Sequence, residues 1–189
     1  MLKLNVPFDG EIISKKEYMC SENAVARYLA YKGIKINAEI LHRRGCLSID
    51  SISKCLSEAI DHPFIHATLN TNKIPSILLL LMTRDIFIYL INQKEPFFVS
   101  IIPDTNWIKY KAKSLIIKTN IEEYYHTILF IGYKDESKRE DINIFYVHDE
   151  DPFQELNFNS FFKLFVRTGY QFIIQKKYFD KFIPYIKKY

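Results

Sequence analysis

Apolar residues in the first half of the chain recur with the spacing of amphipathic helices. Over residues 21–32 they return every three or four positions, and Gly33 is a residue type that commonly ends a helix. Similar patterns predict a helix from a cap at Asn37 through Arg44 to a stop at Gly45, another after a cap at Ser48, and a third over 84–92. The residues expected to face the core are Ala24, Val25, Tyr28 and Leu29 in the first helix, Ile49, Ile52, Leu56 and Ala59 or Ile60 after Ser48, and Ile86, Tyr89 and Leu90 in the last.

Extended segments are predicted mainly in the second half. In the first half only Leu2–Phe8, which ends at the turn signal Asp9-Gly10, and Phe64–Leu69 have an extended pattern. Beyond Pro96 the predicted elements are strong strands at Phe97–Ile102, His126–Tyr133 and Ile142–His148, a weaker strand at Leu115–Lys118, a short helix at Asn159–Val166 and a last strand at Tyr170–Gln175. Helices in front of a mostly antiparallel sheet indicate an α+β fold.

Length and charge narrow the class of protein. The 189 residues suit one domain, expected over 1–177, followed by a basic segment over 178–189. The net charge is +4, but residues 176–189 alone carry +4, so the other residues sum to zero. A neutral body lacks the basic face that binds nucleic acid, and no nucleic-acid partner is expected. Three cysteines do not make a disulfide framework and fit a reducing compartment.

No segment has the pattern of a signal peptide or a membrane span. The most apolar stretch, Ile74–Ile91, is interrupted by Arg84 and Asp85, so we expect a cytoplasmic protein, with export by a non-classical route left open. Tyr178–Tyr189 alternates lysines with aromatic and apolar residues. It fits contact with an anionic membrane surface, but a terminal helix packed on the domain with its lysines outward is the favoured interpretation.

Three positions are candidates for chemistry. Cys20 lies at the predicted start of the first helix, where the helix dipole favours a thiolate nucleophile; the alternative is a small buried apolar side chain. His126 opens a core strand, and Asp149 or Asp151 follows the strand expected to pair with it. If those strands form a hairpin, either carboxylate can orient the imidazole. The remaining cysteines and histidines are interpreted as surface or packing residues; they are Cys46, Cys55, His42, His62 and His66.

Taken in order, these residues follow the chain order of a papain-like Cys-His-Asn/Asp site. The sequence resembles the papain-like peptidases that process bacteriocin leader peptides, together with related stand-alone domains that include aminoglycoside side-chain acyltransferases. The segments that carry the resemblance are Val6-Pro7-Phe8, Cys20 to Gly33, Gly45 to Leu56, Ile88 to Ile101, His126 to Tyr133, and Asp149 to Pro152 with Asn159-Ser160-Phe161-Phe162 after it. The resemblance implies a helical lobe packed on an antiparallel sheet lobe.

Two positions depart from that family. The family has a Gln about six residues before the Cys, which donates to the oxyanion; position 14 is Ser, and Glu11 is the other candidate by local context. An ionised Glu repels an oxyanion and donates only when burial keeps it protonated. The family also has Gly where this chain has Ser21. The Cys20 backbone N–H is the expected first oxyanion donor, with Glu11 or Ser14 as the candidate second.

The resemblance implies a thiol-dependent hydrolase or acyl transferase that acts on a peptide or amide bond. The substrate is then a peptide or an acyl-carrying molecule. An alternative is a weak or inactive papain-like module whose cleft binds a peptide or a partner protein. No cofactor and no metal is expected, because the chain has neither a glycine-rich phosphate loop nor the paired short His/Cys spacings of a zinc site.

Overall fold

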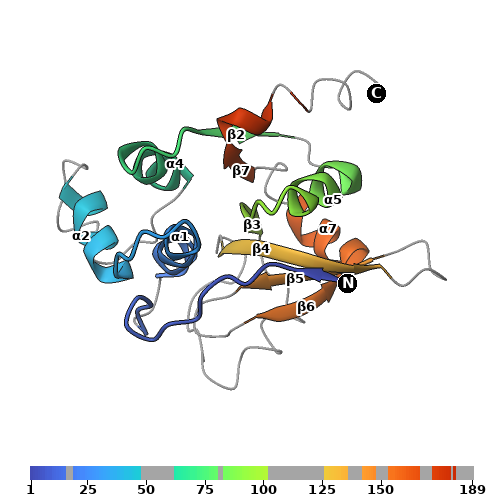
Figure 1. Cartoon of the computed structure of the whole chain (residues 1–189), viewed down its shortest axis with the longest axis horizontal. Helices are drawn as coiled ribbons and strands as arrows, with labels where there is room; N and C mark the ends of the chain where they lie inside the picture. Colours follow the sequence, from blue (N-terminus) through green and yellow to red (C-terminus); the bar gives the residue numbers. More distant parts are fainter. Residues whose placement is uncertain are drawn as a thin grey trace.

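The computed structural model describes residues 1–15, 19–47, 62–80, 83–101, 126–135, 142–147, 153–166, 172–179 and 181 (Figure 1). These residues form the α+β fold that the sequence predicts, with every strand pairing antiparallel. The helices are α1 (Cys20–Tyr31), α2 (Ala38–Leu47), α4 (His62–Thr71), α5 (Arg84–Asn92), α7 (Phe158–Val166) and the 3-10 turn η2 (Lys176–Tyr178). The strands are β1 (Leu2–Lys3), β2 (Ser76–Leu79), β3 (Phe97–Ile101), β4 (His126–Asp135), β5 (Ile142–Val147), β6 (Gln154–Asn157) and β7 (Phe172–Gln175).

The described strands form one sheet in the order β2-β7-β3-β4-β5-β6. The hairpin expected from the sequence is present, because β4 pairs with β5 in a register that sets Leu129 opposite Val147. On the other side of β4, β3 pairs with its first half and sets Ile101 opposite His126, and β1 pairs with its second half. The start of β4 is therefore paired with β3, and from Leu129 onward the strand also pairs with β5 on its other side.

Gly132 makes the pairing of β1 possible. A Cβ at this position would lie 2.3 Å from the carbonyl oxygen of Leu2, a distance that no side chain tolerates. A register shift between Phe130 and Gly132 lies at the same place in the β4–β5 pairing. The Gly-Tyr sequence at the end of the predicted strand thus marks a close approach of two backbones.

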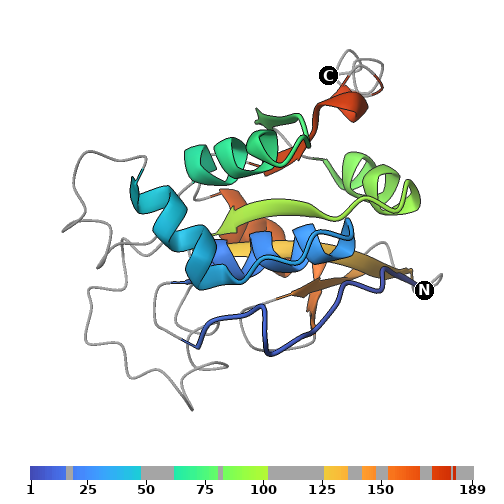
Figure 2. The ribbon, with the colours of Figure 1, turned by 60° about the vertical axis from the view of Figure 1, so that its left-hand side comes forward.

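Helix α1 is the central helix of the fold. It packs on β4 and contacts α2 and α4 (Figures 1 and 2). Every residue from Cys20 to Leu29 is buried, including the charged Glu22 and Arg27. The four residues expected on its apolar face, Ala24, Val25, Tyr28 and Leu29, are all in the core. Gly33 follows with a φ of 83°, which confirms its predicted role in ending the helix.

Aromatic rings fill the space between the sheet and helices α5 and α7. Phe87 of α5 meets the rings of Phe97 and Phe130 edge to face, with centroids 5.5 and 5.0 Å apart. Phe130 also meets Phe161 of α7 at 4.8 Å. Such pairs add to the free energy of burial, so this aromatic cluster fixes the distance between the helices and the sheet.

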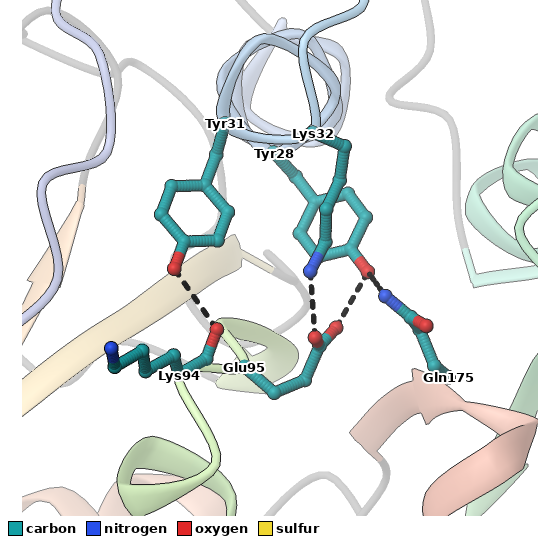
Figure 3. A network of polar contacts seen from close by, with 6 residues as sticks. All are labelled: Tyr28, Tyr31, Lys32, Lys94, Glu95 and Gln175. Atoms are coloured by element: carbon teal, nitrogen blue, oxygen red, sulfur yellow. Dashed lines mark hydrogen bonds and ion pairs between the residues drawn. The ribbon is translucent and has the colours of Figure 1, made fainter.

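A buried carboxylate ties the C-terminal end of α1 to the turn before β3. Glu95 is 1% exposed and accepts hydrogen bonds from the Tyr28 hydroxyl at 2.6 Å and from the Lys32 ammonium at 2.7 Å (Figure 3). Gln175 of β7 donates to the same Tyr28 hydroxyl at 2.8 Å. Burial, and next the Glu95 charge, raise the pKa of Tyr28, which therefore stays a neutral donor. One polar network thus joins the C-terminal end of α1, the turn before β3, and β7.

Most predicted elements agree with the structure to within two residues, but three predictions were wrong. Phe64–Leu69 is not extended: it lies in α4, where Ile65 and Leu69, four residues apart, both face the core. Pro63 at the first turn of α4 also favours a helix. Of Leu2–Phe8, only Leu2–Lys3 forms a strand. Helix α2 does not stop at Gly45 but continues to Leu47.

Other predictions were incomplete or concern residues that the structure does not describe. In α5, Phe87 and Ile91 are buried with Ile86 and Leu90, whereas Tyr89 is only partly buried. The short strands β2 and β6 were not predicted. The strand at Leu115–Lys118 and the helix after Ser48 lie outside the described residues. Among the described helices, none combines the length and the apolar character needed to cross a membrane.

Candidate functional site

Cys20 is the first residue of α1, the position expected of a helix-start nucleophile. It is 3% exposed and is a thiol, not half of a disulfide. The first turn of a helix presents backbone N–H groups and the positive end of the dipole, both of which favour an anion. The position of Cys20 therefore suits a thiolate, and its role as nucleophile stays a prediction.

A hydroxyl pair joins the start of α1 to the start of β4. The Ser21 Oγ and Thr127 Oγ1 atoms lie 2.9 Å apart, and both side chains are buried. Ser21 directly follows Cys20, and Thr127 directly follows His126, the first residue of β4. The fold thus places the two predicted catalytic residues on chain segments that touch, although they are over a hundred positions apart in the sequence.

Ser14, one of the two candidate oxyanion donors, is buried in a network of its own. Its backbone N–H donates to the Asn23 Oδ1 atom at 2.8 Å, and its carbonyl accepts from the Asn23 Nδ2 atom at 3.0 Å. Its hydroxyl donates to the Glu39 Oε1 atom at 3.2 Å. Ser14 therefore lies next to the first turn of α1, but its hydroxyl proton is engaged by the carboxylate of α2.

Glu11, the other candidate donor, is exposed. Its backbone N–H donates to the Asp9 carboxylate at 2.9 Å, and its carbonyl accepts from the Asn37 side chain at 2.6 Å. The Glu11 side chain thus faces solvent and is not buried beside the first turn of α1. The Ser14 hydroxyl is thus engaged by Glu39 and the Glu11 side chain is exposed, so the Cys20 backbone N–H remains the expected oxyanion donor.

A buried acid–histidine pair lies beside the nucleophile position and was not predicted. Glu22 is fully buried, and its Oε1 atom is 2.6 Å from the Nδ1 atom of His42 on α2. Within the described part of the chain, its other oxygen, Oε2, has no hydrogen-bond partner. Burial raises the pKa of Glu22, and the contact with His42 opposes that effect. No local signal reveals the pair, because its members are twenty positions apart.

The other predicted residues divide as follows. Asp149, Asp151 and Cys55 lie outside the described residues, and Cys46 lies in α2. His66 bonds the Ser76 hydroxyl at 2.8 Å and so packs α4 against β2. His62 begins α4. The described residues contain no group of three or more His, Cys, Asp or Glu side chains placed to hold a metal ion.

Comparison with solved structures identifies the fold. The chain superposes on the crystal structure of a protein from Bacillus anthracis described as a C39-like peptidase, with a TM-score of 0.63 and 13% sequence identity. The match covers 93% of this chain and 97% of that one. The papain-like fold inferred from the ordered Cys, His and Asp segments is therefore confirmed. No protein-family model matches the sequence, and no curated protein does.

Proposed function

We propose that the protein is a thiol-dependent acyl-transfer enzyme that acts on a peptide or amide bond. The observation that carries the proposal is the contact between Ser21 and Thr127, which brings the start of the Cys20 helix against the start of the His126 strand. The likeness of the fold to a C39-like peptidase supports the same class of chemistry. A peptide is the substrate class that this likeness favours.

In the proposed mechanism, the Cys20 thiolate attacks the acyl carbon and forms a C–S bond. The backbone N–H of Cys20, at the N-terminus of α1, donates to the oxyanion. His126 takes the thiol proton and gives it to the leaving amine as the C–N bond breaks. Water, or a second amine, then attacks the thioester, and His126 takes the proton of that acceptor and returns it to the departing sulfur.

An acid completes the site in this proposal. Asp149 and Asp151 follow β5, the strand that pairs with β4, and either carboxylate would orient the His126 ring and stabilise its charged form. We favour Asp149, because it comes first after the strand. The acceptor of the acyl group distinguishes a peptidase from an acyltransferase, and both readings use the same three residues.

A second candidate function is peptide binding without turnover. Two residues stand as candidates for the position of the family's oxyanion Gln, and their contacts favour this function. The Ser14 hydroxyl donates to Glu39, and the Glu11 side chain is exposed. Loss of one oxyanion donor typically lowers the rate by about 10²–10³. In this alternative the domain holds a peptide or a partner protein next to Cys20.

Labelling and turnover separate the two functions. The protein is treated with an activity-based thiol probe at neutral pH, and labelled cysteines are identified by mass spectrometry. Hydrolysis of a fluorogenic peptide library is measured for the wild type, Cys20→Ala and His126→Ala, with Cys46→Ala as the matched thiol control. An enzyme loses turnover in the first two variants only. Slow labelling of Cys20, no faster than that of Cys46 and Cys55, together with turnover unchanged in Cys20→Ala, would contradict the mechanism.

A further inference from the structure

Asn23 is buried in the first turn of α1, three residues after Cys20, and both the oxygen and the nitrogen of its side-chain amide bond the backbone of Ser14. Its Oδ1 atom accepts from the Ser14 N–H at 2.8 Å, and its Nδ2 atom donates to the Ser14 carbonyl at 3.0 Å. The two bonds satisfy both backbone groups of Ser14 as a neighbouring strand would. A side-chain amide carries a donor and an acceptor side by side, and these match the carbonyl and the N–H of Ser14.

The segment around Ser14 is held from α2 as well. The carbonyl of Ile12 accepts from the backbone N–H of Ala38 at 2.8 Å, and the Ser14 hydroxyl donates to Glu39 at 3.2 Å. The contacts from α2 attach the segment to the helical lobe. The contact from Asn23 is different, because it starts within one turn of Cys20 and so sets the position of the segment relative to the sulfur.

We propose that Asn23 is a positioning residue for the acyl-transfer site. It holds the chain six positions before Cys20 against the first turn of α1, so that the two segments form the wall around the oxyanion at a fixed separation. This inference rests on the proposed function, since it assigns Asn23 a part in the same site. Displacement of reacting groups by about 1 Å can lower a rate by about 10²-fold, so loss of the amide contact is expected to reach the chemical step.

Two reagents separate positioning from a merely structural effect. Acylation of Cys20 by p-nitrophenyl acetate builds an oxyanion, whereas alkylation of the same thiolate by iodoacetamide does not. In Asn23→Ala, the acylation burst at Cys20 should slow by about tenfold or more. The rate of alkylation and its pH profile, which report the thiolate, should stay as in the wild type. Both reactions are followed at Cys20 by peptide mass spectrometry.

Three further variants sharpen the test. Asn23→Asp keeps the shape and the acceptor but loses the donor to the Ser14 carbonyl, so it should slow acylation selectively even if Asn23→Ala does not fold. Asn72→Ala removes an amide that donates to the carbonyl of Thr68 in α4 at 2.8 Å, its one side-chain bond within the described residues, and should change neither rate. Cys20→Ala gives the background rate of acylation.

The outcomes are distinct. Unchanged acylation in both Asn23 variants, or an equal loss of acylation and alkylation, would overturn the positioning role. If the wild type is acylated no faster than Cys20→Ala, the proposed function itself is overturned. That comparison involves no Asn23 variant, so the two failures are distinguishable.

Discussion

The hydroxyls of Ser21 and Thr127 lie 2.9 Å apart and join the residue after Cys20 to the residue after His126. The family that the sequence resembles has Gly at the position of Ser21, so Ser21 departs from the family's pattern. In this chain its hydroxyl is paired with the Thr127 hydroxyl in a buried contact. The hydroxyl that Ser21 adds at this position thus has a hydrogen-bond partner on β4, the Thr127 hydroxyl.

The first prediction concerns this pair. Ser21→Ala and Thr127→Val should each lower the free energy of unfolding by about 1 kcal/mol, because each leaves the other buried hydroxyl without its partner. The double variant should cost less than the sum of the two, since it leaves neither hydroxyl unpaired. Urea unfolding of the four proteins measures the coupling, and strictly additive losses would show that the two hydroxyls do not act together.

Glu95 gives the second prediction. Glu95→Gln should lower the free energy of unfolding by about 1.5–3 kcal/mol, because a buried carboxylate that accepts from Tyr28 and Lys32 is replaced by a neutral amide. The pKa of nearby Tyr178, which burial and next the Glu95 charge raise to about 12, should fall in the same variant. Denaturant unfolding and ultraviolet titration of the tyrosines report the two effects.

An exposed ion pair serves as the control for Glu95. The Lys35 Nζ and Asp9 Oδ2 atoms lie 3.4 Å apart, but the Lys35 side chain is 76% exposed. Lys35→Met should therefore change the free energy of unfolding by less than about 0.5 kcal/mol. If Lys35→Met costs as much as Glu95→Gln, burial is not what makes the Glu95 network stabilising.

Sequence patterns located the site's framework because its elements are locally determined. The 3.6-residue spacing of Val25, Tyr28 and Leu29 with Gly33 behind it defines α1, and runs of apolar residues define β3 and β4. The predicted helix start at Cys20 and the β4–β5 hairpin follow from the same signals. The spacing of apolar residues does not indicate which helix start faces which strand. That prediction came from the order of Cys20, His126 and the Asp residues along the chain.

Long-range polar contacts were beyond sequence patterns. Asn23 with Ser14 and Glu22 with His42 are pairs whose members are nine and twenty positions apart, so no periodicity links them. The helix α4 was misjudged because its short apolar run fits a strand as well as a helix, and only packing of Ile65 and Leu69 decides. Partial agreement of this kind is expected where tertiary contacts override local preference.

The third prediction tests the close approach at β4. Gly132→Ala should destabilise the protein by more than about 1 kcal/mol or detach β1, because the new Cβ meets the backbone of Leu2 and Lys3. Gly10→Ala is the matched control, since nothing lies within 4 Å of a Cβ there. Amide hydrogen exchange at Leu4, whose N–H bonds the Ile131 carbonyl at 2.7 Å, reports release of β1. Unchanged protection at Leu4 with unchanged stability would contradict the prediction.

The fourth prediction is a pH dependence that originates at Glu22. Burial raises the pKa of this carboxyl above its usual value of 4.5, so between 4.5 and the raised pKa the folded state binds more protons than the unfolded state. The contribution of Glu22 to stability is therefore complete below pH 4.5 and is lost as the pH rises through the raised pKa. Glu22→Gln lacks this titration and retains a group that can bond His42. Urea unfolding of both proteins from below pH 4.5 to neutrality should show the wild type losing stability relative to Glu22→Gln as the pH rises. A constant difference between the two curves, or one that changes in the opposite direction, would show that the buried carboxyl is not protonated more readily in the folded state.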